Sequence, residues 1–403
     1  MKKLLLASLL LFSCTSKQSL DLENSGTSSI QSNNSKLEII KKSLDNKNKT
    51  GLGSVKFVYN KNKIYSDTED PGDPIFSLDY DGNSLFNEKV VAHGSNLIVL
   101  KDDSLILNYV NSNKKLALGI LNTNSLKIEQ LYESPAFIVN SALSHDKKTI
   151  AFIEPVNSNL VYIKIFNLET KRVTSYFQIN YSDSDLIFSG DNKNIFVAQK
   201  GGIISLDINS KNKSYLIKDE NYNFSDLALS PDKTSLAFSK DYKPCSNKEI
   251  ERRLKKVEVL SLKNTTSLPL DVNYNGNLLY NPCKPDNVKK LVNESYPLFF
   301  SNEELVFHSE VSVKRDGFDS EPDTPILDSG TNIIASKYKT KQGKFITLIN
   351  EVGDDGYIDV RGKKSGGNLW FIDQDRKKIV FVRKTEVYSI NFDGSDEKLI
   401  VEN

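Results

Sequence analysis

Three histidines, His93, His145 and His308, are the side chains best suited to acid–base catalysis in this chain. A serine hydrolase of the common exported type places its nucleophile in a G-x-S-x-G turn, followed by an acid and a histidine. That pattern does not occur in the sequence. His145 lies in a predicted turn, where a solvated histidine is the ordinary case. We therefore predict no catalytic residue, and the sequence disfavours such a hydrolase.

Acidic residues alternate with glycines between Asn350 and Asp359, where Asp354, Asp355 and Asp359 offer carboxylate oxygens. Calcium loops use oxygen ligands in a similar D-x-D-x-D-G arrangement. The loop is incomplete, because Gly353 and Gly362 stand where two further ligands are required. The alternative is a simple Asp-Gly turn. We expect no other metal and no cofactor, since no aromatic stripe indicates a cofactor slot.

The chain begins with Lys2 and Lys3, an apolar run over residues 4–12, and then Ser13 and Cys14. An apolar run of about nine residues is too short to span a bilayer, so residues 1–13 are predicted to be an export signal. Residues 11–14 resemble the bacterial lipobox, which implies acylation of Cys14 and a lipid anchor. Thr15 in place of aspartate favours the outer membrane over the inner one. The alternative is an ordinary secretory signal with an incidental Cys14.

Two further cysteines, Cys245 and Cys283, each follow a proline. An exported protein enters a compartment that permits disulfides, so an even pair is a candidate bridge. We predict that these two cysteines are joined, and two free thiols are the alternative.

The charge of the chain is balanced, with 53 Lys and Arg against 52 Asp and Glu among 403 residues. This balance gives no basic excess for nucleic acid, so no nucleic-acid partner is expected. Residues 14–50 are rich in Ser, Asn, Lys and Gln and are predicted to form a lipidated flexible tether. Residues 51–403 are predicted to fold.

The folded part repeats one pattern of strand, turn and strand, and it is predicted to be all-β. Three copies contain Ser144, Ser189 and Ser230, which places them about 41 to 45 residues apart. Four strands in that length form one blade of a β-propeller, which must stack on its neighbours in a ring. Weaker copies bring the expected number of blades to about seven, with six as the alternative.

The segments Leu229–Phe238 and Val387–Gly394 resemble the repeats of the TolB-like, WD-type propeller family. The resemblance covers most of residues 55–400 and implies the fold, because propellers carry many activities. Two inserts, near 241–256 and 309–328, exceed what a blade requires. Within the first, Asn247–Val257 has the spacing of a charged surface helix.

Loops that project from a rigid scaffold commonly bind partners. We therefore predict an envelope lipoprotein, on the periplasmic side or at the cell surface, whose propeller binds another envelope protein or a peptide segment without catalysis. The alternative is a ligand-binding, hydrolytic or lyase-type propeller that acts on a glycan, peptide or lactone. A third interpretation is a structural envelope protein.

Overall fold

The computed structural model describes the folded part of the chain with several gaps. The described residues are 56–60, 62–67, 70–158, 160–180, 185–242, 254–264, 266–269, 290–314, 327–337, 342–350, 370–373, 375–383 and 386–400. Every regular element among them is a β-strand. Within these ranges there is consequently no helix of the length and apolarity that crossing a bilayer requires.

The strands of the first half form four sheets, numbered as blades in chain order. Blade 1 contains β1 (Lys56–Asn60), β2 (Lys63–Asp67), β3 (Pro74–Tyr80) and β4 (Leu85–His93). Blade 2 contains β5 (Ser95–Lys101), β6 (Ser104–Val110), β7 (Leu116–Asn122) and β8 (Lys127–Glu133). Blade 3 contains β9 (Ser141–Leu143), β10 (Thr149–Asn157), β11 (Leu160–Asn167) and β12 (Arg172–Asn180). Blade 4 contains β13 (Asp185–Phe188), β14 (Asn194–Gln199), β15 (Gly202–Asp207) and β16 (Lys213–Lys218).

The second half of the chain forms three more sheets. Blade 5 contains β17 (Asn223–Leu229), β18 (Ser235–Tyr242), β19 (Leu254–Ser261) and β20 (Thr266–Pro269). Blade 6 contains β21 (Lys290–Phe299), β22 (Glu304–Lys314), β23 (Leu327–Lys337) and β24 (Gln342–Asn350). Blade 7 contains β25 (Trp370–Asp373), β26 (Lys378–Arg383), β27 (Glu386–Asn391) and β28 (Lys398–Leu399).

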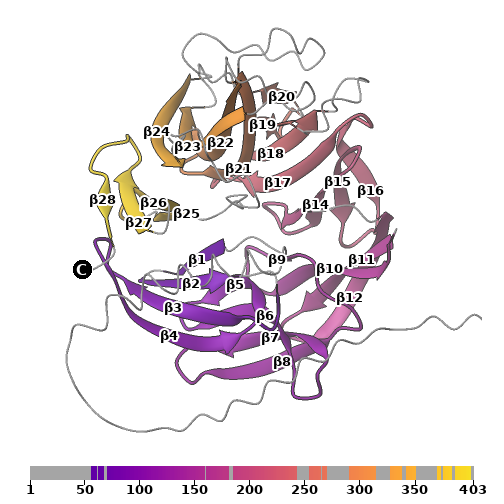
Figure 1. Cartoon of the computed structure of the whole chain (residues 1–403). Helices are drawn as coiled ribbons and strands as arrows, with labels where there is room; N and C mark the ends of the chain where they lie inside the picture. Colours follow the sequence, from indigo (N-terminus) through magenta and orange to yellow (C-terminus); the bar gives the residue numbers. More distant parts are fainter. Residues whose placement is uncertain are drawn as a thin grey trace, which may run out of the picture.

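Each sheet is an antiparallel meander in which strands adjacent in sequence are adjacent in space. The seven sheets stand in a ring, with the first strand of each blade toward the axis and the fourth at the rim (Figure 1). Each blade contacts the next, and β1 contacts β25, so that blade 7 meets blade 1. The prediction of an all-β propeller is confirmed, and the described residues form seven blades.

Alternation along the strands places one apolar face of each blade against its neighbour. Between blades 3 and 4, for example, Ile153, Ile163 and Phe177 pack with Ile195 and Leu206 in one cluster. A fully buried side chain of this size contributes about 1.5–3 kcal/mol by leaving water. A four-stranded blade alone would leave this face exposed, so the blades stabilise one another.

The repeated serines fix the turn between the first two strands of blades 3, 4 and 5. In blade 4 the Ser189 hydroxyl donates to Asp191 (2.7 Å) and accepts from the Asn194 amide (2.9 Å). The hydrogen bond from Ser189 lowers the pKa of Asp191, because it stabilises the ionised carboxylate. Ser144 and Ser230 make the equivalent contacts in blades 3 and 5. The sequence repeat is therefore a repeat of turn chemistry.

One expectation about local structure was wrong. Residues 254–257, the end of the expected helix Asn247–Val257, form the beginning of strand β19. There Val257 is fully buried in the pairing of β19 with β18, and this burial outweighs the weak local preference for a helix. Residues 243–253 and 315–326, which make up most of the two predicted inserts, lie outside the described residues.

Side chains close the ring between blades 7 and 1. Each blade is built from four consecutive strands, so among the described residues no strand from one end of the chain completes the sheet at the other. Instead, Arg376 Nη1 lies 3.1 Å from Asp373 Oδ2 in blade 7 and donates to Tyr59 Oη of blade 1 at 3.2 Å. Arg376 Nη2 donates to Asn62 Oδ1 at 3.1 Å. At the rim, the Leu85 amide donates to the Ile400 carbonyl at 2.8 Å.

The closure residues, Tyr59, Asn62, Asp373 and Arg376, depend on two local conditions. Burial and the nearby Asp373 carboxylate raise the pKa of Tyr59 to about 12, so the phenol keeps its proton and donates to Asp373 at 3.3 Å. Gly82 has a φ of +97°, and a Cβ there would lie 2.4 Å from Arg376 Cδ. Only glycine therefore lets the β3–β4 turn pass beneath the arginine.

We predict that Arg376→Met lowers the free energy of unfolding by about 3 kcal/mol, because it leaves the fully buried Asp373 without its cation. Urea unfolding followed by circular dichroism measures this loss. The matched control is Lys398→Met in the same blade, whose exposed pair with Asp396 is expected to contribute less than about 1 kcal/mol. Equal losses in the two variants would contradict the role of the closure residues.

Candidate functional site

A pocket of about 640 Å³ lies at the outer end of the junction between blades 3 and 4. Strand β12 provides one wall with Val173, Thr174, Tyr176, Phe177 and Gln178, and blade 4 provides the other with Leu206, Lys211 and Lys213. Phe177 and Leu206 belong to the apolar cluster that joins the two blades, so the floor of the pocket continues the core. We refer to these eight residues as the rim pocket.

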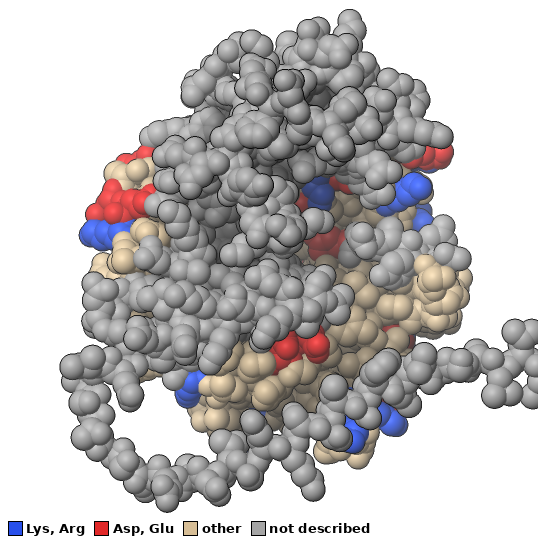
Figure 2. Space-filling model, viewed as in Figure 1, with Lys and Arg blue, Asp and Glu red and all other residues tan. Residues whose placement is uncertain are grey.

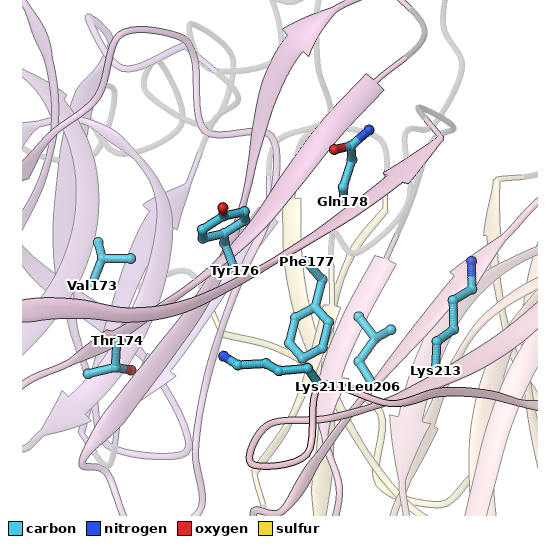
Figure 3. Close-up of a pocket in the computed structure, with 8 residues that line it drawn as sticks. All are labelled: Val173, Thr174, Tyr176, Phe177, Gln178, Leu206, Lys211 and Lys213. Carbon is cyan, nitrogen blue, oxygen red and sulfur yellow. The ribbon is translucent and has the colours of Figure 1, made fainter.

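The rim pocket carries positive charge without a compensating acid. Lys211 and Lys213 line it, and none of its eight residues is acidic. Lys211 Nζ lies 5.6 Å from the centre of the Phe177 ring, and Figure 3 shows its chain beneath that ring. Neither lysine forms an ion pair within the described part of the chain. Asp207, in the same turn as Lys211, instead accepts hydrogen bonds from two backbone amides.

Strand β12 turns its two faces to different surroundings. Figure 3 shows Tyr176 and Gln178 pointing away from Phe177, on the opposite side of the strand. The Tyr176 side chain is 63% exposed, and its ring meets that of Tyr162 edge to face at 5.4 Å. This contact fixes the orientation of the exposed Tyr176 side chain at the outer edge of the propeller.

The second wall depends on a close approach of two strands at Gly202. Residue 202 has a φ of +153°, and a Cβ there would lie 2.2 Å from the Ile217 carbonyl oxygen and 3.1 Å from Tyr215. The register of β15 with β16 shifts at this end of the pair. Gly202 therefore sets the position of β16, which carries Lys213 and the half-exposed Tyr215.

A buried polar network joins blade 3 to blade 2 behind the rim pocket. Glu154 is 3% exposed and forms an ion pair with Lys164 on the neighbouring strand. Glu154 also accepts from the Ser134 hydroxyl at 2.7 Å and from the Tyr132 hydroxyl at 3.0 Å. Burial lowers the pKa of Lys164, but hydrogen bonds to Glu154 and Tyr132 outweigh it and leave the pKa raised. With its groups satisfied in this way, the network fixes strands and is no candidate for acid–base catalysis.

Polar side chains also connect the inner strands around the axis. The hydrogen bonds run from Asn96 to the Ile138 carbonyl (3.1 Å), from Asn140 to Asp185 (2.9 Å), from the Leu227 amide to Asp185 (2.7 Å) and from the Tyr296 amide to Asp226 (3.3 Å). Acidic and basic surfaces are visible in the hollow at the middle of the ring (Figure 2). The four hydrogen bonds join one blade to the next, so we assign the residues that form them to the assembly of the ring.

Of the candidate residues named from the sequence, the structure describes only the three histidines. Cys14, Cys245, Cys283 and the aspartates 354, 355 and 359 all lie outside the described residues. His93, His145 and His308 lie in different blades, on β4, in the β9–β10 turn and on β22. Within the described ranges, no group of three or more His, Cys, Asp or Glu residues could hold a metal ion.

Sequence reasoning missed the rim pocket, although one signal for it is present. Strand β12 contains a single charged residue, Arg172, whereas the outer strands on either side carry several. An outer strand usually needs charge to protect its free edge, so a nearly uncharged one marks a candidate contact surface. The two lysines, Lys211 and Lys213, come to lie opposite β12 only when the blades stack.

Three known structures illustrate what the chain is similar to. An oligogalacturonate lyase in complex with manganese aligns with a TM-score of 0.51 at 12% identity, covering 82% of this chain and 86% of that one. An oligogalacturonate lyase from Vibrio parahaemolyticus aligns with a TM-score of 0.50 at 9% identity, covering 86% and 89%. TolB from Acinetobacter baumannii also matches, with a TM-score of 0.41 at 14% identity, covering 76% and 67%.

Identities this low show a shared propeller fold and nothing about activity. No protein-family model matches the sequence, and a search of curated proteins found no match. The function must therefore be argued from the residues themselves.

We predict that Gly202→Ala destabilises the protein more than Gly201→Ala, the matched control next to it. Both positions have positive φ, which costs a side chain about 1–3 kcal/mol. A Cβ at 201 would meet nothing nearer than 3.8 Å, whereas one at 202 would collide with the backbone of β16. Thermal unfolding measures the difference, and equal midpoints would contradict the close approach.

Proposed function

We propose that this protein is an envelope lipoprotein whose propeller is a binding platform for another envelope protein or a peptide segment. The observation that carries the proposal is the rim pocket, in which two lysines that have no acidic partner among the described residues lie beside a nearly uncharged outer strand. A ligand that supplies negative charge and apolar contact is complementary to such a surface.

The fold supports a binding role because it presents that surface rigidly. The two walls come from adjacent blades joined by one apolar cluster, so the pocket exists before a partner arrives. A preformed site loses little conformational entropy on binding. A glycan-acting or hydrolytic propeller is the alternative, and it requires acid–base residues that converge on one site. The candidate histidines lie in separate blades.

We predict that a photo-crosslinking amino acid in place of Tyr176 gives a discrete adduct in the native envelope. The exposure of this side chain means that the replacement costs little stability. The adduct should be lost in Lys211→Gln/Lys213→Gln, which removes both pocket charges but keeps the side-chain stems. The matched control, Lys200→Gln/Lys263→Gln, removes two exposed lysines in other turns and should leave the adduct unchanged. An adduct that is insensitive to the pocket variant would argue against the rim pocket as the platform.

The anchoring part of the proposal rests on Cys14 and is tested separately. The mature amino terminus should carry several acyl chains on Cys14, and Cys14→Ser should move the protein from the membrane fraction to the soluble fraction, because those chains supply the attachment. Mass spectrometry and fractionation measure these two effects. An unmodified mature Cys14 would show an ordinary secretory signal instead, whatever the rim pocket binds.

A further inference from the structure

We propose that the rim pocket takes an extended acidic peptide segment of the partner, which adds as a fifth strand to the outer edge of β12. This inference rests on the proposed function, since it names the chemistry of the partner at the same site. Two independent features of blades 3 and 4 lead to it: the free edge of β12 and the unpaired charge opposite it.

The free edge of β12 supplies main-chain hydrogen-bonding groups. Strand β12 is the last strand of its sheet and, among the described residues, pairs only with β11, so no described strand pairs with its outer row of amides and carbonyls. It is nine residues long, and Val173 and Tyr176 are exposed on it. Long outer strands with exposed apolar side chains are templates for strand addition, which native proteins normally block with charge or proline. By comparison, β8 carries Lys127, Glu129 and Glu133, and β20 ends in Pro269.

The charge opposite that edge determines which segment fits. A strand added to β12 would lie about 4.8 Å beyond it and would alternate its side chains between the two faces. One face is turned toward blade 4, where Lys211 and Lys213 stand above the apolar floor formed by Phe177 and Leu206. Acidic side chains at every second position would reach these lysines. The other face borders Tyr176, so apolar or β-branched residues suit the alternate positions.

Charge alone would also attract an anionic glycan, but the edge of β12 favours a peptide. A sugar chain has no regular row of amide donors and carbonyl acceptors to match a strand edge. A peptide satisfies both the edge and the lysines. The inference therefore commits to a peptide, and a glycan is an outcome of the test.

The experiment uses the mature full-length chain and a nine-residue peptide that alternates glutamate with valine or threonine. Calorimetry should show that the peptide binds and that its affinity falls with added salt. Hydrogen–deuterium exchange should slow at residues 172–180 of β12 but not at residues 127–133 of β8, the outer strand of blade 2. The same peptide with lysine in place of glutamate should not bind. A peptide N-methylated at alternate residues keeps the charge but lacks the donors, so it should also fail.

The variants locate the binding surface. Lys211→Glu/Lys213→Glu should weaken the acidic peptide by about tenfold or more, because two exposed ion pairs are replaced by repulsion. Lys200→Glu/Lys263→Glu adds the same charge elsewhere and should change the affinity little. Circular dichroism of both variants checks that they fold.

The inference is wrong if the N-methylated peptide binds as tightly as the parent, or if exchange at β12 does not slow. It is also wrong if oligogalacturonate binds through the two lysines while the acidic peptide does not. In either case, a Tyr176 adduct that is lost in Lys211→Gln/Lys213→Gln would still support the platform. If the peptide does not bind and the Tyr176 adduct also persists in Lys211→Gln/Lys213→Gln, both proposals are wrong.

Discussion

Closing the ring between blades 7 and 1 is the constraint on which the rest of this protein depends. In the seven consecutive meanders that the structure describes, no backbone ladder joins the first blade to the last. The buried Asp373, the Arg376 guanidinium and the Tyr59 hydroxyl take over that task, together with one backbone bond at the rim. A charged group buried at such a junction is stable only while its partner stays in place, so the contact is specific as well as stabilising.

The same logic governs the junctions between the other blades. Apolar clusters supply most of the free energy, because each blade has two faces and can cover neither alone. Polar groups then fix the register of one blade against the next, as Glu154 does with Tyr132 and as Asp185 does with the Leu227 amide. Apolar contacts and polar contacts thus have separate roles at the junctions between blades.

The rim pocket follows from that division. At the outer end of the junction between blades 3 and 4 the apolar cluster ends, and the outer strands are exposed to solvent. The neighbouring outer strands β8 and β16 carry three and two charged residues, whereas β12 carries one and leaves Tyr176 exposed beside two lysines. A binding surface can lie there without disturbing the core, because its exposed side chains, Tyr176, Lys211 and Lys213, are not part of the apolar cluster between the blades.

The repeat, the all-β fold and the turn chemistry follow from the amino-acid sequence, because they depend on residues that are close together in the chain. Ser189 and Asp191 lie two residues apart, and their hydrogen bonds need no other part of the chain. Tertiary structure alone decided the closure residues and the rim pocket. Arg376 meets Tyr59 from the far end of the chain, and Phe177 meets Lys211 across two blades. No periodicity encodes such pairs, since they form only when stacking brings the faces of separate sheets together. For the same reason burial overrode the helical spacing before Val257, where pairing with β18 decided the outcome.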